Sequence, residues 1–580
     1  MFSRQRFNKF WKTHVALLAT VTMCAPLAFA QQGSVIQKKF IEAGWDKPDT
    51  ARLRANLSQM EKTPFDGVII GVTGKDDAGK TVQARSAFSD VPWKKAWFQS
   101  SIDDLNAIHS KKLTDNLIQV GANPGNVDWF DDAGWKQIVN HFRIVAEIAK
   151  EGHLKGILFD PEAYTKPYRQ FDYSTQAQHD KHTFEQYQAK ARQRGKEVIA
   201  AVASVDRNLL FYTFFMNSVN ATAIKTPDPQ MALQTYSYNL YPAFINGWLD
   251  AAPPSMIFVD GCEGQGYHGN SQLDFLQTAN LIRNTALDLV APENRQKYLA
   301  QVQVSFGLYL DAYVNPPTSP WYIDPKGVSP TQRLQINAGF ATESANEYVW
   351  VYGEKYRWWP TPNGSVNPES WEDKLPGITN ALLAVSHPDI MAEQIISSLE
   401  KKGKLENLML NGDFVSGKTN ATAANNTPAD WKTVGAPANW STWQIQESHG
   451  TFSQDNSVSH SNDKSGAARL AGVENGCIIQ SIAVKPGESY VVQAWNRQLG
   501  QGNCWMRVRW QTADNKWTDE ASDVLLFARK NADQQEWQRI QGVATVPADA
   551  GKMVILLSAA NQPTAQDVAW YDDVHVYKIQ

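Results

Sequence analysis

Two acidic side chains, Asp160 and Glu162, follow the short apolar run Gly156-Ile-Leu-Phe159. The run predicts a buried strand over 156–160, and residues two apart on a strand point to the same side. We therefore expect both carboxyl groups to face one space at the C-terminal end of the strand. A neighbouring negative charge raises the pKa of a carboxylic acid, so one member of such a pair keeps its proton near neutral pH. The pair suits general acid–base chemistry, with Glu162 as the acid.

A repeated alternation of apolar runs and amphipathic segments must position this pair. It extends from about residue 36 to 400, and it is typical of βα units around a parallel sheet. A doubly wound open sheet is the alternative, but no glycine-rich nucleotide-binding turn follows the first strand. We predict a (β/α)₈ TIM barrel over residues 31–403. Its expected strands are 39–45, 67–72, 116–121, 156–160, 209–215, 256–260, 301–310 and 348–352.

After the polar junction Lys401-Lys-Gly-Lys404 the composition and the hydrophobic periodicity of the sequence change. Short alternating strands replace helical periodicity, and Asn, Ser, Gly and Thr become frequent. This pattern is typical of an all-β sandwich of the jelly-roll kind. Residues 404–580 are therefore predicted to form a second domain.

Acidic and aromatic residues gather where the barrel strands are expected to end. In a barrel this rim carries the active site. Glu354 is our choice for a second catalytic carboxylate, Glu263 is its close competitor and Asp311 comes third, although any one of them could be a solvated or arginine-paired surface group. The residues expected to contact a substrate are Trp45, Trp129, Tyr164, Asn217, Tyr267, His268, Tyr309 and Tyr352.

Carboxylates among aromatic walls make the barrel resemble glycoside hydrolases, without pointing to one family. One carboxylic acid would protonate the glycosidic oxygen and a second carboxylate would act as nucleophile or base. The stretch from Gly156 to Glu162 is also similar to the end of the chitinase-type motif, with Leu158 in place of an Asp and Pro161 in the middle. That likeness implies Glu162 as the acid and Asp160 as the group that orients a substrate N-acetyl group. It would leave no role for a protein nucleophile.

The two ends of the C-terminal region, 406–414 and 569–577, resemble the opening and closing strands of galactose-binding-like, carbohydrate-binding jelly rolls. The resemblance implies a structural Ca²⁺ near Asp573, although Asp573 could equally just end a strand. It also implies sugar binding through aromatic side chains in loops, while a purely structural appendage remains the alternative. The candidate aromatics are Trp431, Trp440, Trp443 and Trp517.

Residues 1–30 read as an export signal. A basic segment precedes an apolar run over 15–27, and Ala28-Phe29-Ala30 offers a cleavage pattern. We expect an exported protein, periplasmic or extracellular, with no integral membrane segment after cleavage. Of the cysteines that follow, Cys262, Cys477 and Cys504, the last two could form a disulfide or stay free.

The net charge of −4 gives no electrostatic case for nucleic acid. The leading hypothesis is a secreted glycosidase that acts on a poly- or oligosaccharide without a catalytic cofactor. The alternative is a non-catalytic polysaccharide-binding or scaffold protein on a degenerate barrel. A serine esterase is disfavoured because we find no Gly-x-Ser-x-Gly segment. An arginine clamp on Asp160 or Glu162 would favour simple sugar binding.

Overall fold

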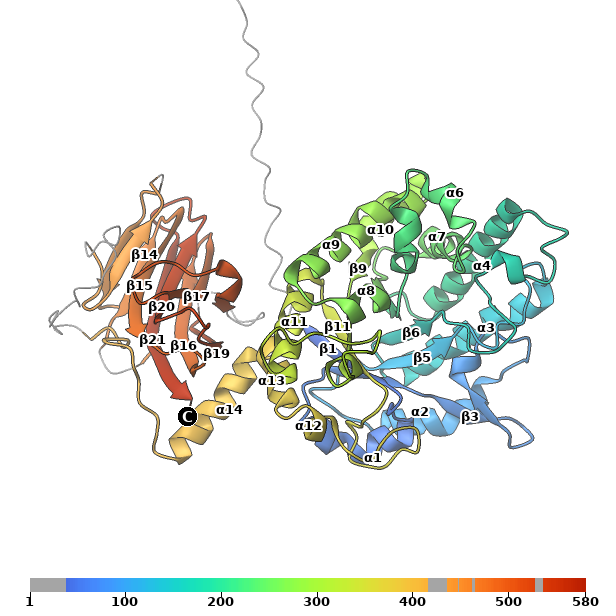
Figure 1. Cartoon of the computed structure of the whole chain (residues 1–580), viewed down its shortest axis with the longest axis horizontal. Coiled ribbons are helices and arrows are strands. Elements are labelled where there is room, and N and C mark those ends of the chain that lie inside the picture. Colours follow the sequence, from blue (N-terminus) through green and yellow to red (C-terminus); the bar gives the residue numbers. More distant parts are fainter. Residues whose placement is uncertain (1–37, 416–434, 447, 462–464, 527–535, 580) are drawn as a thin grey trace, which may run out of the picture.

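The computed structural model describes residues 38–415, 435–446, 448–461, 465–526 and 536–579. The expected signal segment 1–30 and Trp431 lie outside these residues. An α/β region and an all-β region lie side by side, and helix α14 (Pro388–Lys401) bridges them (Figure 1). Among the described residues, no helix combines the length and the apolar character needed to cross a membrane.

The α/β region is built on one curled sheet of parallel strands. In the described chain it has nine strands in the order β10-β11-β1-β2-β5-β6-β7-β8-β9. All eight predicted strand segments are present, with ends shifted by a few residues. The strands are β1 (Lys39–Gly44), β2 (Gly67–Ile70), β5 (Leu117–Gly121), β6 (Gly156–Asp160), β7 (Leu210–Thr213), β8 (Phe258–Asp260), β9 (Val302–Val304), β10 (Gly307–Tyr309) and β11 (Tyr348–Gly353).

The predicted uninterrupted ring of eight strands needs correction, because the segment expected as one strand over 301–310 is split. β9 pairs with β8 and β10 pairs with β11, and only Ser305 and Phe306 separate the two pieces. Both edges of the sheet thus belong to one chain segment. Around the split, Ser305 N donates to Asp260 O at 2.9 Å and Trp350 N donates to Phe306 O at 3.0 Å. The sheet is therefore a curled nine-stranded one rather than a closed ladder.

Helices cover the outside of the curled sheet (Figure 1). They follow the strands in βα order, as the hydrophobic periodicity predicts. In α3, for example, Trp135, Ile138 and Phe142 are buried on the face turned to the core. The helices are α1 (Thr50–Met60), α2 (Gln99–Asn106), α3 (Asp132–Glu151), α4 (Phe184–Val205), α5 (Ala221–Ile224), α6 (Pro229–Leu233), α7 (Tyr241–Ala251), α8 (Glu263–His268), α9 (Gln272–Arg283), α10 (Arg295–Gln301), α11 (Pro330–Ser344), α12 (Trp371–Lys374) and α13 (Ile378–Ser386).

A small hairpin that we did not predict follows β2. Its strands β3 (Thr73–Lys75) and β4 (Thr81–Gln83) pair antiparallel, and a turn of 3-10 helix over Ala84–Ser86 comes next. The hairpin matters for the site because it carries Gln83 and Arg85 to the C-terminal ends of β2 and β5.

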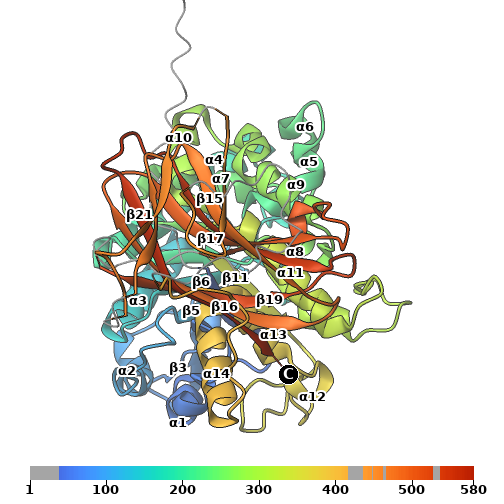
Figure 2. The ribbon, with the colours of Figure 1, turned by 90° about the vertical axis from the view of Figure 1, so that its left-hand side faces the viewer.

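As predicted, the C-terminal region is a β-sandwich (Figure 2), and its described residues form two antiparallel sheets of five strands each. The sheet orders are β12-β15-β20-β17-β18 and β13-β14-β21-β16-β19. Trp510, Ile540 and Tyr571 are among the side chains buried between them. The strands are β12 (Ser441–Gln444), β13 (Thr451–Asp455), β14 (Ala467–Ala471), β15 (Asn475–Ala483), β16 (Ser489–Leu499), β17 (Asn503–Gln511), β18 (Val524–Leu526), β19 (Gln538–Thr545), β20 (Lys552–Ala560) and β21 (Val568–Ile579).

Cys477 and Cys504 are free thiols, so the disulfide alternative is wrong. Cys477 on β15 lies opposite Ser558 of the central strand β20, while Cys504 on β17 lies opposite Ala559 of the same strand. Ser558 and Ala559 are consecutive, so their partners point to opposite faces of the sheet. The sulfur atoms lie on opposite faces of the sheet with strand β20 between their strands, a separation that a disulfide cannot span.

Helix α14 packs on the outer face of the sheet that contains β16, β19 and β21. Ala392 and Leu399 of the helix share a buried apolar cluster with Val491 and Tyr577 of the sandwich. Polar contacts frame this cluster: Gln541 Nε2 donates to the carbonyl oxygen of residue 389 at 2.7 Å. The helix therefore holds the sandwich against the α/β region through side chains as well as through the chain itself.

Candidate functional site

The C-terminal ends of the parallel strands surround a cavity of about 480 Å³. Four carboxyl groups line it, and they come from the ends of three strands. Asp160 ends β6 and Glu162 follows it, Glu263 follows β8, and Glu354 follows β11. The structure thus brings together four of the five acidic residues that the sequence singled out.

Asp160 is the most enclosed of these groups, with 1% of its surface exposed. Its Oδ1 atom accepts a hydrogen bond from the backbone N–H of Glu162 at 3.0 Å, which fixes the turn between them. Burial, together with the charge of Glu162, raises the pKa of Asp160 to about 7. Arg85 Nη2 lies 3.7 Å from Asp160 Oδ2, and that oxygen accepts no hydrogen bond from any described residue. The arginine is near but does not clamp the acid.

Glu162 is half-buried and accepts a hydrogen bond from the hydroxyl of Tyr164. The loop that carries both is tied to the end of β5 through Asn123, whose Nδ2 donates to Glu162 O at 2.9 Å and whose Oδ1 accepts from Tyr164 N at 2.9 Å. Tyr164 is 52% exposed, and the guanidinium of Arg85 lies 4.5 Å from the centre of its ring. Tyr164 therefore forms a wall of the cavity, as expected.

Glu263 owes its position to a tight turn after β8. The buried carboxylate of Asp260 accepts hydrogen bonds from the Ser218 hydroxyl at 2.5 Å and from Cys262 N at 3.1 Å. Cys262 itself has the left-handed backbone conformation (φ 43°), which is unfavourable for a side chain other than glycine and is held only by such surrounding contacts. The next residue, Glu263, begins α8 and points into the cavity.

The pKa of Glu263 is raised well above its ordinary value. Burial is the largest cause, and the charges of Glu162 and Asp160 come next, followed by that of Glu354. Burial and the neighbouring negative charges both disfavour the ionised form of this carboxyl group. Glu263, which the sequence offered as a competitor, is thus a second candidate for the acid of the site, and the choice of Glu162 stays a prediction.

Glu354 is supported by two other residues named from the sequence. Its Oε2 atom accepts a hydrogen bond from the Tyr309 hydroxyl at 2.9 Å, and its backbone N–H donates to Asp311 Oδ2 at 2.8 Å. Asp311 is buried and is not among the residues that line the cavity, which corrects its candidacy as a catalytic carboxylate. Burial raises the pKa of Asp311 to about 6. Asp311 is thus a positioning residue for Glu354.

Aromatic rings form one side of the cavity. Trp45, which is 51% exposed, and Tyr352 line it directly. Behind Tyr352 the ring of Tyr267 is stacked on those of Tyr352 and Tyr309, with centroids 5.8 and 4.9 Å apart. His268 lies outside the lining and stacks on the half-exposed Trp321 at 4.6 Å. Tyr267, Tyr309 and His268 therefore support or flank the wall and do not line the cavity.

Two residues expected to contact substrate are in the interior instead. Trp129 is fully buried, stacks on Trp135 at 4.7 Å and donates its indole N–H to Gln170 O at 2.9 Å. Asn217 is also fully buried and does not line the cavity. Both residues follow the end of a strand, as expected. The loops after β5 and β7 turn these side chains into the protein interior, and the spacing of residues along the chain does not predict this orientation.

In the sandwich, the aromatic candidates have different environments. Trp440 is buried and donates its indole N–H to Asn411 O at 3.1 Å, so it is a core residue. Trp443 is half-buried on the outer face of its sheet, beside Cys477. Trp517 is 40% exposed, and the guanidinium of Arg509 lies 4.4 Å from the centre of its ring.

Asp573, the residue nominated for a structural Ca²⁺, contacts a histidine. Its Oδ2 atom lies 2.6 Å from Nδ1 of His460. Among the described residues no group of three or more His, Cys, Asp or Glu side chains is arranged to hold a metal ion. A Ca²⁺ ion is also bound by backbone carbonyls, so this ion stays a prediction.

Reasoning from the sequence missed several polar groups of the site. Glu42 on β1 is fully buried beneath the rim, and burial raises its pKa to about 8, with the charge of Asp46 adding to the effect. A glutamate within the apolar run Lys39-Phe-Ile-Glu-Ala43 is a sequence feature that could have predicted a buried acid. Lys47, Arg85 and Gln119 line the cavity too, and they lie after β1, in the hairpin connection and on β5.

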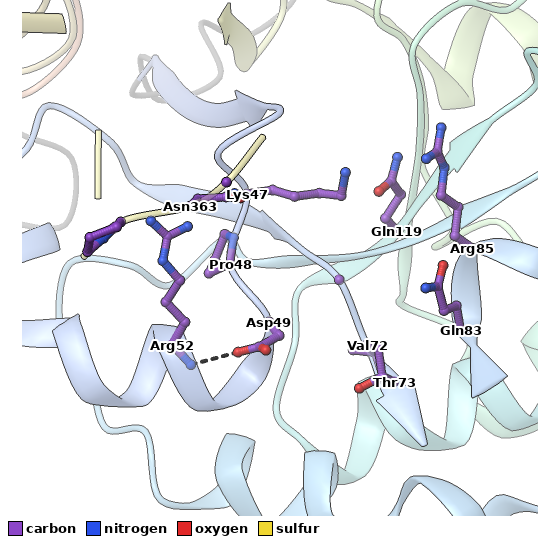
Figure 3. A pocket seen from close by; sticks show the side chains of 13 residues that line it. Lys47, Pro48, Asp49, Arg52, Val72, Thr73, Gln83, Arg85, Gln119 and Asn363 are labelled. Atoms are coloured by element: carbon purple, nitrogen blue, oxygen red, sulfur yellow. Dashed lines mark hydrogen bonds between the residues drawn. The ribbon is translucent and has the colours of Figure 1, made fainter. Parts of the chain in front are cut away.

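A second cavity of about 540 Å³ adjoins the first (Figure 3). Lys47, Arg85 and Gln119 line both, so the two cavities share a wall. The four carboxyl groups described above line the first cavity. The second cavity is lined by Arg52 and Asp49, together with further polar side chains and backbone.

No family model matches the chain, and no curated protein matches it. Solved structures similar to part of it include the CBM22-1 xylan-binding domain of Paenibacillus barcinonensis Xyn10C, at 10% identity over 25% of this chain and 89% of that chain, with a TM-score of 0.20. A family 16 carbohydrate-binding module has 18% identity over 26% and 96% of the two chains, with a TM-score of 0.17. The enzymatically active domain of bacteriophage CBA120 tailspike protein 4 has 14% identity over 30% of this chain and 21% of that chain, with a TM-score of 0.21.

Proposed function

We propose that this protein binds a carbohydrate in the rim cavity and hydrolyses a glycosidic bond there, as an exported glycoside hydrolase on a (β/α)₈-type barrel interrupted at Ser305 and Phe306. The observation that carries the proposal is the convergence of Asp160, Glu162 and Glu263 with Glu354 on one aromatic-walled cavity. Glycosidic hydrolysis needs one carboxylic acid that is protonated and one carboxylate that is ionised.

In this proposal Glu263 is the general acid. It protonates the glycosidic oxygen as the bond between that oxygen and the anomeric carbon breaks. Its raised pKa favours the protonated form, and its place at the start of α8 directs the carboxyl group into the cavity.

Glu354 is the second carboxylate, which attacks the anomeric carbon or removes a proton from the attacking water. The hydrogen bond from Tyr309 orients its carboxyl group, and Asp311 fixes its backbone. Glu162 also accepts a tyrosine hydrogen bond, from Tyr164, and is the competitor for this role. Asp160 holds the turn that presents Glu162.

Single substitutions in the full chain test the assignment. We expect Glu263→Gln and Glu354→Gln each to lower the release of reducing ends from a broad glycan panel by about 10²- to 10⁴-fold. Glu400→Gln on the exposed surface of α14 is the matched control and should cleave like the wild type. Wild-type protein that binds glycans but releases no reducing ends from any of them would support a non-catalytic binding protein instead.

We further propose that the sandwich holds the protein on its substrate. Trp517, exposed beside Arg509, offers an aromatic face of the kind that covers a sugar ring. Retention of the full chain on insoluble polysaccharides should fall with Trp517→Ala. Unchanged retention would exclude this residue from glycan binding.

A further inference from the structure

Lys47 and Arg85 give the wall between the two cavities a positive charge. The charged side chains that line the second cavity are Lys47, Asp49, Arg52 and Arg85. Two of them are already engaged. Asp49 accepts a hydrogen bond from Arg52 N and caps α1, while the guanidinium of Arg52 donates to Asp46 and Thr361. Lys47 and Arg85 remain as the charges that face the open space.

Lys47 extends along the wall toward Gln119 and Arg85 (Figure 3). Within the described residues, no hydrogen bond or ion pair joins its ammonium group to another side chain. Burial and the nearby charge of Arg85 lower the pKa of Lys47. A buried ammonium beside a guanidinium is unfavourable by itself, and a bound anion would relieve both the desolvation and the repulsion.

Arg85 also has donor capacity to spare. Its contact with Asp160 is 3.7 Å long, and its Nε atom is buried without a hydrogen-bond partner among the described residues. Stacking against Tyr164 fixes the plane of the guanidinium at the boundary of the two cavities. A fixed guanidinium plane suits the recognition of planar or tetrahedral oxyanions.

Gln119 adds a neutral polar group between the two cations. It is 5% exposed, and its Oε1 atom is buried without a hydrogen-bond partner in the described part of the chain. A buried amide oxygen left unpaired is costly, so it signals a missing partner such as a sugar hydroxyl.

The acids nearest to Lys47 do not cancel this positive charge fully. They are Asp160 and Glu42, and burial raises their pKa values to about 7 and about 8. Near neutral pH both acids therefore carry less negative charge than exposed carboxylates would.

We propose that Lys47 and Arg85, with Gln119, form a subsite for an anionic sugar, so that the substrate is a glycan that bears a carboxylate or a sulfate ester next to the bond to be cleaved. The proposal rests on glycan binding in the rim cavity. The shared wall places the anionic group within one sugar unit or so of the catalytic carboxylates. Neutral glycans would leave the Lys47 ammonium and the buried Arg85 Nε without a hydrogen-bond acceptor.

Binding by the full-length Glu263→Gln variant, measured by calorimetry in low and high salt, tests the subsite. The probes are trisaccharides of galacturonic, glucuronic and mannuronic acid, the neutral methyl ester of each, and sulfated and unsulfated galactose oligosaccharides. We expect at least one anionic probe to bind about tenfold or more tightly than its neutral partner, with a preference that weakens as salt rises. Which probe pair shows the preference distinguishes a carboxylate from a sulfate ester.

Adding Lys47→Met should abolish that preference, whereas Lys136→Met on the exposed face of α3 should leave it intact. Equal binding of every charged and neutral pair, or a preference that survives Lys47→Met, would overturn the subsite. Anion-selective binding by a protein that cleaves nothing would keep the subsite and refute the hydrolase. Cleavage of neutral glycans without any preference for anionic probes would support the hydrolase and refute the anionic subsite.

Discussion

Replacing Asp160 by Asn should make the protein more stable at alkaline pH. Asp160 is almost completely buried, and its pKa rises from 3.8 to about 7 on folding. The shift of about three pKa units corresponds to about 4 kcal/mol. Asn has nearly the same shape, and its side-chain oxygen can still accept the hydrogen bond from Glu162 N, so the substitution removes mainly the ionisation.

The sign follows from the direction of this shift. Between pH 3.8 and about 7 the folded protein binds a proton at Asp160 that the unfolded chain has released. The free energy of unfolding of the wild type therefore falls as pH rises through this window, and the loss is complete above it. Asp160→Asn cannot ionise, so its stability relative to wild type should grow by up to about 4 kcal/mol between pH 4 and pH 8.

Urea denaturation of the full chain, followed by tryptophan fluorescence at intervals from pH 4 to pH 8, measures this difference. Glu42 titrates in the same direction, but it is present in both proteins and cancels in the comparison. Asp288→Asn, at an exposed position, is the control and should follow the wild-type curve. Parallel curves for wild type and Asp160→Asn would refute the reasoning, because they would mean that Asp160 ionises in the folded protein as easily as in water.

Three further predictions concern the supports of the site and the sandwich. Tyr309→Phe removes one hydrogen bond to the side chain of Glu354 and should lower kcat/KM by about tenfold, measured with the glycan that the wild type cleaves best. Asp311→Ala should lower kcat by more than Asp311→Asn, because only Asn keeps an acceptor for the Glu354 N–H; equal losses in the two variants would argue against positioning. Alkylation of the unfolded, non-reduced protein followed by mass spectrometry should find Cys477 and Cys504 both modified, whereas a mass that shows them joined would contradict the register of their strands.

The strand segments could be predicted because each is an apolar run between turn-forming residues, and such runs form buried parallel strands with little dependence on their surroundings. The split of the segment 301–310 could not. Next to the split, the rings of Tyr267 and Trp350 pack so tightly on the backbone of Gly307 that a Cβ atom there would lie 2.7 Å from each ring. Such close packing arises only when the sheet has assembled. In the sequence it is visible only as the glycine at position 307.

The convergence of Asp160, Glu162 and Glu354 could also be predicted, because strand parity and parallel strand direction bring such residues to one edge of a sheet. The proposal of Glu263 as the acid could not be reached in this way. The pKa of Glu263 is raised by burial and by three carboxylates from two other strands, and none of these distances is encoded in residue spacing. For the same reason Lys47 and Arg85 escaped notice, since a connection and an unpredicted hairpin bring them to the rim.

The most direct test of the central claim is the effect of Glu263→Gln on two substrates that differ only in their leaving group. An aryl glycoside with a dinitrophenol leaving group needs no proton from the enzyme, whereas the matching natural disaccharide does. The sugar is the one that wild-type protein releases from the glycan panel. We predict that kcat/KM of the variant stays close to the wild-type value for the aryl glycoside and falls at least about a hundredfold for the disaccharide. Equal losses on both substrates, or no loss on either, would contradict the assignment of Glu263 as the proton donor of a glycoside-cleaving site.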